Sequence, residues 1–133
     1  SVNSEAAARK KSHRAHHYIL ATGGFLGGGF TTQDRAYAQE TIFNLPVDTP
    51  FSRPDWFLPD FSPPGGHPIF SAGILVNQQF APLSPKNQIP FTNLSVVGGA
   101  LGKFDPLLER SLEGVAITSG YWAAHMLGEA SLE

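Results

Sequence analysis

The feature that most constrains the fold is a short apolar run near the end of the chain that stops at paired glycines. Leu94-Ser95-Val96-Val97 precedes Gly98 and Gly99. Such a run is typical of a buried strand whose backbone then turns sharply or approaches another group closely. From Leu107 onward, apolar residues recur at helical spacing, interrupted only by a serine: Leu108, Leu112, Val115, Ser119, Trp122 and Met126. The unit is therefore predicted to fold as strand, glycine loop and helix, with backbone N–H groups free to meet a ligand.

Glycine and proline are frequent along the rest of the chain. The 133 residues include 14 glycines and 11 prolines, and 41% of the residues are hydrophobic. This content is enough for one modest core, so residues 1–133 are predicted to form a single domain. The predicted fold class is α/β to α+β, loop-rich, with a few short strands and one long C-terminal helix.

Charge and cysteine content exclude several kinds of partner and site. The net charge of −2, with 15% charged residues, does not supply the surplus of lysine and arginine that binding to a nucleic-acid backbone needs. The chain has no cysteine, which excludes disulfides, thiolate metal sites and a cysteine nucleophile. No apolar run approaches the roughly 20 residues of a membrane-spanning helix. These features predict a soluble intracellular protein with no nucleic-acid partner and no direct membrane insertion.

The two ends of the chain indicate an excerpt of a longer protein. The chain starts without methionine at a polar stretch, residues 1–5, that matches no recognisable fold unit. Leu132-Glu133 is a dipeptide commonly left by a cloning site, so residues 132–133 are interpreted as possible vector residues.

Several shorter elements are predicted between the two ends. A second buried strand covers residues 18–22 and stops at Gly23 and Gly24, and glycines at 27–29 extend that loop. A short helix is predicted at 33–38, a strand at 41–47, a hairpin from 72–76 and 79–81, and a turn at 84–87. Residues 48–68 are rich in proline and aromatic residues and are predicted to form an irregular excursion.

Residues with an obvious metal or catalytic pattern are few. His13 and His17 are four positions apart, but a strand would separate them by roughly 13 Å, which is too far to share one ion. No metal site is predicted. The chain has no Gly-x-Ser-x-Gly elbow, no Walker loop and no Gly-x-Gly-x-x-Gly after a strand. In the proline-rich region, Arg53 and His67 are the candidates for contact with a substrate or for proton transfer.

Two motifs taken together resemble a known class of flavoproteins. Residues 18–25, Tyr-Ile-Leu-Ala-Thr-Gly-Gly-Phe, and residues 93–99, Asn-Leu-Ser-Val-Val-Gly-Gly, are similar to the second and last conserved strands of the glutathione-reductase-like, two-dinucleotide-binding flavoproteins. The resemblance implies an FAD/NAD(P)-binding-like fold. In that fold the last strand leads to a helix whose N-terminus faces the isoalloxazine ring of the flavin. Backbone N–H groups and the helix dipole would there stabilise negative charge on the reduced ring.

The resemblance is closer to the B subunits of anaerobic glycerol-3-phosphate dehydrogenases, from about residue 16 to residue 130. It rests further on residues 40–47, on residues 73–83 and on Gly-Lys-Phe-Asp-Pro at 102–106. It implies a flavin-binding protein, with FMN or FAD, that partners the catalytic A and the iron–sulfur C subunits of the same complex. The complex is implied to be cytoplasmic and peripheral at the inner membrane, oxidising glycerol 3-phosphate to dihydroxyacetone phosphate and passing electrons toward quinone. This chain would be the C-terminal part of such a B subunit. Alone, it is expected to be inactive and to bind flavin weakly or not at all.

The resemblance also assigns the cofactor-binding residues. They are Thr22, Gly23 and Gly24 of the Ala-Thr-Gly motif, Gly98 and Gly99 of the last-strand turn, and Ser111, Leu112, Gly114 and Val115 at the helix entry. Two positions depart from the family pattern. Gly99 stands where many members of the class carry a glutamate, and Glu113 would face the reduced ring unfavourably unless it points away.

Two other functions stay open on the sequence alone. One is a different flavin dehydrogenase of the fumarate-reductase type. The other is a non-catalytic interaction module that docks partner subunits through the aromatic residues of segment 51–61. Those aromatic residues would instead be buried if they packed on the core of the chain, so the burial of Trp56 and Phe57 distinguishes docking from packing.

Overall fold

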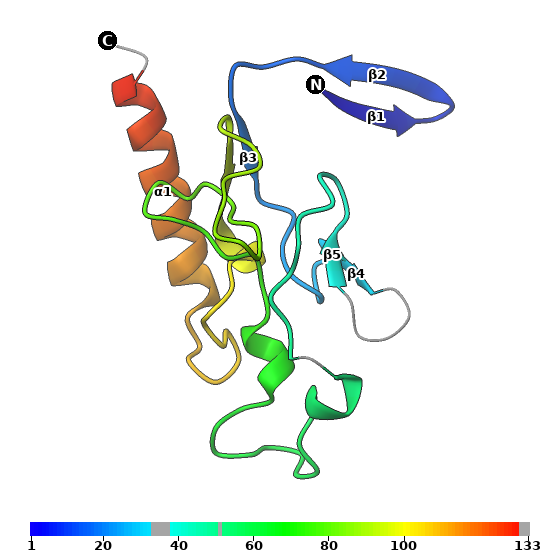
Figure 1. Ribbon diagram of the computed structural model, residues 1–133, viewed down its shortest axis with the longest axis vertical. Coiled ribbons are helices and arrows are strands. Elements are labelled where there is room, and N and C mark those ends of the chain that lie inside the picture. Colours follow the sequence, from blue (N-terminus) through cyan, green and yellow to red (C-terminus); the bar gives the residue numbers. More distant parts are fainter. Residues whose placement is uncertain (33–37, 51, 131–133) are drawn as a thin grey trace.

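The computed structural model describes residues 1–32, 38–50 and 52–130, which form short strands, 3-10 turns and one long helix (Figure 1). The strands are β1 (Val2–Ala6), β2 (Arg9–His13), β3 (Tyr18–Leu20), β4 (Phe30–Thr32), β5 (Ala38–Glu40) and β6 (Leu94–Val96). The 3-10 turns are η1 (Arg53–Asp55), η2 (Pro68–Ser71) and η3 (Gly98–Ala100), and the helix is α1 (Leu112–Ala130). Leu132 and Glu133, interpreted as vector residues, lie outside the described residues.

The two strands predicted from apolar runs pair with each other. β3 and β6 are parallel, with Tyr18 opposite Leu94 and Leu20 opposite Val96. The backbone N–H of Val97 donates to the carbonyl of Leu20 at 2.9 Å, which extends the pairing by one residue. Because the strands are parallel, their carboxyl ends lie at the same edge, and the glycine loop that follows each strand is brought to the same place.

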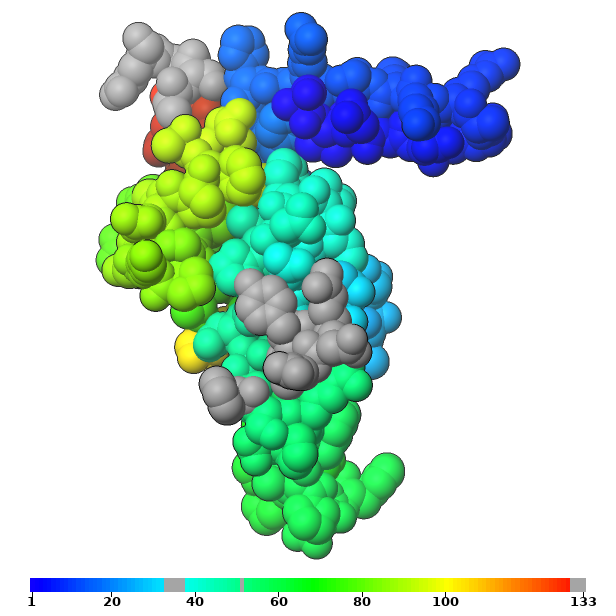
Figure 2. Space-filling view, turned by 45° about the vertical axis from the view of Figure 1, so that its right-hand side comes forward, coloured from blue at the N-terminus to red at the C-terminus, as the bar shows by residue number. Residues whose placement is uncertain are grey.

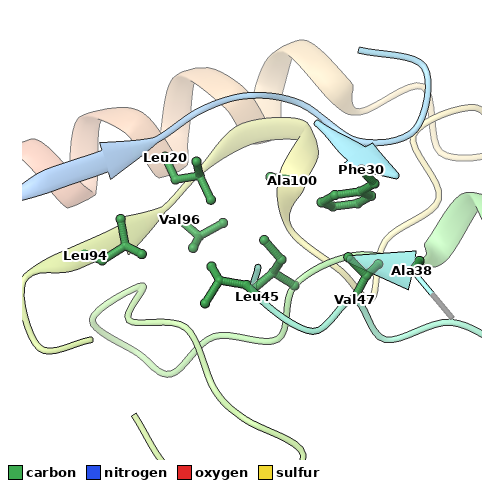
Figure 3. Packing of buried hydrophobic residues seen from close by; sticks show 9 residues of the cluster. Leu20, Phe30, Ala38, Leu45, Val47, Leu94, Val96 and Ala100 are labelled. Atoms are coloured by element: carbon green, nitrogen blue, oxygen red, sulfur yellow. The ribbon is translucent and has the colours of Figure 1, made fainter. Parts of the chain in front are cut away.

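The main core lies between this strand pair and the segment that follows β5. Figure 3 shows Leu20 and Val96 pointing from the strand pair toward Leu45, with Val47 beside Ala38 in the same cluster. Burying such aliphatic side chains stabilises the fold by about 1.5–3 kcal/mol each. The buried residues of this cluster are Leu20, Phe30, Ala38, Leu45, Val47, Ile74, Leu94, Val96 and Ala100.

The C-terminal helix begins at Leu112, not at Leu107 as the spacing predicts. The cause is Asp105, whose buried carboxylate accepts hydrogen bonds from the N–H groups of Leu107 and Leu108 at 2.9 and 3.0 Å and so forms a separate turn. Arg110 then adopts a positive φ of 52°, which interrupts helical geometry before α1 starts.

The face that α1 packs inward is also narrower than predicted. Ser119 and Ala123 are its buried residues, whereas Trp122 is 49% exposed. Small side chains let the helix approach the glycines of η3 closely. The serine Oγ accepts a hydrogen bond from the N–H of Gly98 at 2.9 Å, so Ser119, which interrupts the apolar spacing, joins the helix to the loop after β6.

The strand predicted at 41–47 is wrong, because the chain turns where that strand was expected. β5 ends at Glu40, and residues 41–43 form a turn. The fully buried Glu40 carboxylate accepts hydrogen bonds from the N–H groups of Ile42 and Phe43 at 2.9 and 2.7 Å. Of the helix predicted at 33–38, residues 33–37 lie outside the described residues, and Ala38 is the first residue of β5 rather than helical.

Residues 72–87 form the predicted chain reversal and turn. Val76 bridges Pro82 in antiparallel fashion, and the N–H of Leu83 donates to the carbonyl of Leu75 at 2.8 Å. The turn at 84–87 is closed by the N–H of Asn87 donating to the carbonyl of Ser84 at 2.8 Å. Ile74 in turn bridges Leu101, which ties this hairpin to the segment after β6.

The N-terminal residues form a β-hairpin, which corrects the view that residues 1–5 match no fold unit. β1 and β2 pair antiparallel, with Val2 opposite His13. Both strands are polar and almost entirely exposed, and the hairpin projects from the rest of the molecule (Figures 1 and 2). Within the part of the chain that the structure describes, no helix is both long and apolar enough to cross a bilayer.

Candidate functional site

The two glycine loops meet at the shared edge of β3 and β6. A Cβ atom on Gly24 would lie 2.8 Å from the carbonyl oxygen of Gly99, so only glycine fits there without a backbone shift. A Cβ on Gly99 would in turn lie 3.3 Å from Leu112 Cδ1, at the start of α1. Gly23 has a positive φ of 78°, a conformation that glycine adopts without strain. The loops therefore present backbone, rather than side chains, at this edge.

A pocket of about 490 Å³ opens beside these loops. One wall is backbone of Gly23, Gly24 and Gly99, and the first turns of α1 contribute Leu112 and Ala116. Other lining residues, among them the aromatic side chains Trp56, Phe57 and Phe70, come from the proline-rich excursion and its continuation. The remaining lining residues are Phe25, Leu26, Gly27, Ile69, Ala72, Pro106 and Leu107.

Some of the predicted cofactor residues line this pocket, and the others are absent from its lining. Gly23, Gly24, Gly99 and Leu112 line it. The N–H of Gly98 is engaged by Ser119, so that group faces the helix and not the pocket. The other predicted residues, Thr22, Ser111, Gly114 and Val115, are absent from the lining.

The chemistry of the pocket fits a flavin. Among the described residues that line it, none carries a charged side chain, and Leu112, the first residue of the long helix α1, is part of the lining. The positive end of a helix dipole stabilises an anion, such as a reduced flavin ring. Glu113 is exposed and absent from the lining, so its carboxylate does not oppose that effect.

Thr22 adds an unpaired polar group beside the glycine loop. Its Oγ1 is buried and has no hydrogen-bond partner among the residues that the structure describes. A buried hydroxyl without a partner costs about 1–3 kcal/mol. Thr22 is absent from the pocket lining, so this buried atom does not contact a ligand held in the pocket.

The aromatic wall of the pocket was missed as a site feature in the sequence. Trp56 is buried, at 8% exposure, whereas Phe57 is 56% exposed and Phe61 fully exposed. Trp56 packs with Ile69 in a small second core that Phe25 and Phe70 also contact. The excursion therefore buries one aromatic residue on the core of the chain and leaves others at the surface, so neither docking nor packing alone describes it. Phe51 lies outside the described residues.

The two candidates for substrate contact are held by the excursion itself. His67 Nδ1 accepts a hydrogen bond from the N–H of Leu58 at 3.1 Å, and its Nε2 lies 3.2 Å from the carbonyl oxygen of Phe61, to which it donates. Arg53 Nη2 donates to Thr32 Oγ1 at 3.0 Å, and its guanidinium lies 5.5 Å from the centre of the Trp56 ring. Arg53 is absent from the lining of the pocket beside the glycine loops.

A second pocket of about 610 Å³ adjoins the first and shares Phe57, Phe70 and Leu107 with it. His67 lines this second pocket together with Asp105 and Arg110. Arg110 has no signal in the sequence, because a single arginine before a helix carries no motif. It contributes a guanidinium to a lining that is otherwise rich in aromatic and aliphatic groups.

The histidines near the N-terminus make separate contacts. His13 Nε2 lies 2.8 Å from Ser4 Oγ across the hairpin, and His17 Nε2 lies 3.0 Å from Ser95 Oγ on β6. Partial burial lowers the pKa of His17 below its ordinary value. Among residues 1–32, 38–50 and 52–130, no three histidine, cysteine or acidic side chains are placed to hold a metal ion.

Comparison with known proteins gives the same class as the two strand motifs. The B subunit of anaerobic glycerol-3-phosphate dehydrogenase from Aliivibrio fischeri strain MJ11 is 34% identical over 116 residues, which is 87% of this chain and 25% of that protein. A probable B subunit of the same enzyme from Halobacterium salinarum strain R1 is 32% identical over 116 residues, 87% of this chain and 26% of that protein. The B subunit from Vibrio cholerae El Tor is 31% identical over 113 residues, which is 85% of this chain and 25% of that protein.

The predicted resemblance and fold class are thereby confirmed. This chain spans about a quarter of the length of the curated relatives that it matches. No solved structure matches it. The family described as FAD binding domain matches residues 2–111, which include both glycine loops. The chain belongs to this FAD binding domain family.

Proposed function

We propose that this chain is part of a flavin-dependent oxidoreductase and forms one side of the flavin site. The proposal rests on one observation. The backbones of Gly24 and Gly99 approach each other closely, and both residues line a pocket without charged side chains that Leu112 of α1 also lines. Close backbone at a helix N-terminus, beside an apolar wall, is the arrangement that a flavin ring with one polar edge requires.

In this proposal each wall of the pocket has its own task. The backbone of Gly23, Gly24 and Gly99 would meet the polar edge of the ring, and the N-terminus of α1 would stabilise its negative charge. Trp56 and Phe70 would exclude water. The bound flavin, FMN or FAD, would supply the two-electron chemistry.

The reaction that we propose is the oxidation of glycerol 3-phosphate to dihydroxyacetone phosphate. The secondary alcohol would lose one hydrogen from its carbon and one from its hydroxyl group, and the two electrons would pass to the flavin. The support is the similarity of this chain to proteins that are B subunits of anaerobic glycerol-3-phosphate dehydrogenases. We propose the matching partners as well, namely the catalytic A and the iron–sulfur C subunits. The complex would pass electrons toward quinone and lie at the cytoplasmic face of the inner membrane.

The second pocket is the place that we propose for the substrate anion. Arg110 offers a guanidinium, which binds phosphate oxygens in a bidentate manner. His67 lines the same pocket, but its two ring nitrogens already bond within residues 58–61, so its proposed role is to shape the wall. Phe57 and Phe70 line both pockets and would set the substrate beside the flavin ring.

Exposed aromatic residues support a second role for the same chain as a docking surface. Phe61 is fully exposed, and Phe57 is 56% exposed. A partner protein that covered the excursion would bury both rings. This role is compatible with the flavin site, because Phe61 lines the second pocket and not the first.

The test of the reaction uses the native assembly that contains this protein. Glycerol 3-phosphate, succinate and NADH are added separately without oxygen, and the visible absorbance of the flavin is followed. We expect glycerol 3-phosphate to bleach the flavin and the other two to leave it oxidised. Bleaching by succinate alone would instead assign a dehydrogenase of the fumarate-reductase type.

A further inference from the structure

The pocket beside the glycine loops has a lining that selects strongly by chemistry. Four of its residues are glycines, and the side chains of the others are aromatic or aliphatic. Among these described lining residues, Trp56 alone has a side chain that can form a hydrogen bond. Its indole Nε1–H already donates to the carbonyl of Pro50 at 3.3 Å. A phosphate or a sugar placed here would lose its hydration and find no side-chain partner.

The aromatic part of the lining is built around Trp56. The carbonyl of Trp56 accepts a hydrogen bond from the N–H of Ile69 at 3.2 Å, and the guanidinium of Arg53 lies 5.5 Å from the centre of the indole ring. Trp56 is therefore held by a hydrogen bond to its backbone, by the hydrogen bond from its indole to Pro50, and by the neighbouring guanidinium of Arg53. A side chain that is fixed before binding loses little conformational entropy when a ligand arrives.

Trp56 also connects the excursion to the glycine loop of β3. The ring of Phe25, which follows Gly24 directly, lies 5.8 Å from the indole at an angle of 49°, and it packs edge-on against Phe30 at 5.3 Å. The aromatic wall and the backbone wall are thus joined at one end of the pocket. The spacing of the two walls is consequently set by packed side chains rather than by loop flexibility.

We propose that Trp56 is the residue that recognises the isoalloxazine ring of the flavin, as the fixed part of an aromatic wall that Phe57 and Phe70 complete. This inference rests on the proposed function, since it names the residue that contacts the flavin in the same pocket. It makes a distinct statement about affinity. The ring alone accounts for binding to this chain, and the phosphate adds little, because no charged side chain is found among the described residues of the lining.

The chain carries a matched internal control for the experiment. It has two tryptophans, Trp56 in the wall and Trp122 on α1 outside the lining. In the full 133-residue chain labelled with ¹⁵N-tryptophan, each indole N–H gives one NMR signal, and the W56F and W122F variants assign the two signals. Weak binding is measurable in this way, so the test holds for a chain that binds flavin with low affinity.

Three probes separate the parts of the flavin: FMN, riboflavin, which lacks the phosphate, and ribose 5-phosphate, which lacks the ring. We expect FMN and riboflavin to shift the Trp56 signal with dissociation constants within about threefold of each other, which is less than about 1 kcal/mol. We expect the Trp122 signal to stay in place, and ribose 5-phosphate to shift neither. The W56L variant should bind FMN at least about tenfold more weakly, and W122L should bind it as the natural chain does.

The outcomes for this residue differ from those for the proposed function. A second sample, labelled uniformly with ¹⁵N, shows the glycine amides. If FMN shifts the amide signals of Gly23, Gly24 and Gly99 but not the indole of Trp56, the flavin site stands and the role of Trp56 is overturned. If no signal of the pocket responds even at FMN concentrations high enough to detect weak binding, the proposed function fails and the role of Trp56 fails with it. A Trp56 response to ribose 5-phosphate equal to that of FMN would overturn recognition of the ring. Far-ultraviolet circular dichroism confirms the fold of W56L, and W56F, which keeps an aromatic ring, should bind more tightly than W56L.

Discussion

Gly24 and Gly99 come from distant parts of the sequence, yet they touch: a methyl group on Gly24 would sit 2.8 Å from the carbonyl oxygen of Gly99. This contact joins the two glycine loops in the lining of the candidate flavin pocket. It exists because β3 and β6 are parallel and end at the same edge. The close approach also leaves the backbone of both loops uncovered by side chains on the pocket side.

The Gly24→Ala variant should therefore be less stable, because the clash is with backbone and cannot be relieved by a rotamer change. We expect the free energy of unfolding, measured by urea denaturation, to fall by about 1–3 kcal/mol. Gly114→Ala is the control, since a Cβ there meets open space on α1. It should raise stability by up to about 1 kcal/mol through helix propensity. Equal stability of the two variants would contradict the close contact.

Ser119 anchors α1 to the loop after β6. Its buried hydroxyl accepts from the N–H of Gly98 and donates to the carbonyl of Val115. Ser119→Ala leaves the N–H of Gly98 buried without an acceptor, which should cost about 1–3 kcal/mol of stability. The exposed neighbour Thr118→Ala should change stability by less than about 0.5 kcal/mol. Thermal unfolding of both variants checks the difference, and a Ser119→Ala variant as stable as the natural chain would disprove the anchor.

The buried carboxylate of Glu40 stabilises a turn. Its two oxygens accept the N–H groups of Ile42 and Phe43, which turns the chain after β5. Glu40→Ala should lose about 1–3 kcal/mol for each N–H left unpaired, and Glu40→Gln, which keeps one acceptor, should lie between. Glu113→Gln on the exposed start of α1 is the control and should stay near the natural value. The ranking Ala below Gln below natural, measured by chemical denaturation, is the expected result.

His17 gives the chain a pH dependence of known sign. Burial lowers the pKa of His17 in the folded state below its unfolded value of 6.5. The unfolded chain therefore binds more protons between the two pKa values, so the stability is present above pH 6.5 and is lost as the pH falls toward the folded pKa. His17→Gln should flatten this slope, while His16→Gln, at an exposed position, should keep it. Unfolding curves collected between about pH 5 and 7 make the comparison, and a slope that survives in His17→Gln would refute the assignment.

The parts of the fold that the sequence predicts correctly are those with strong local signals. The apolar runs at Leu94 and Tyr18 end in glycines, and both form the strands expected of them. The helix start was misplaced because a single side chain, Asp105, caps a separate turn ahead of it. The strand predicted at 41–47 failed for a similar reason, since Glu40 bonds the next turn. Side-chain bonds to the backbone do not appear in hydrophobic periodicity.

The candidate site likewise has some residues that the sequence predicts and others that it does not. Its glycines are visible in the sequence, because paired glycines at the end of an apolar run indicate a tight turn or a close backbone approach. Its aromatic wall is not visible, because Trp56 meets Phe25 only after a long stretch of proline-rich chain has folded back. Arg110 lines the second pocket and has a positive φ, and no sequence motif predicts either feature. Contacts between distant segments define the pocket, and they follow from tertiary packing alone.

The most direct test of the flavin site fills the pocket from the helix side. Ala116 lines the pocket and is exposed on α1, so Ala116→Trp places an indole in the space proposed for the flavin ring without disturbing the main core. Ala124→Trp adds the same group to an exposed position of the same helix and is the control. Equilibrium dialysis of the 133-residue chain against FMN gives the dissociation constants. We predict that Ala116→Trp weakens FMN binding at least tenfold, about 1.4 kcal/mol, and that Ala124→Trp leaves it unchanged. Equal FMN affinity in both variants would contradict the flavin site.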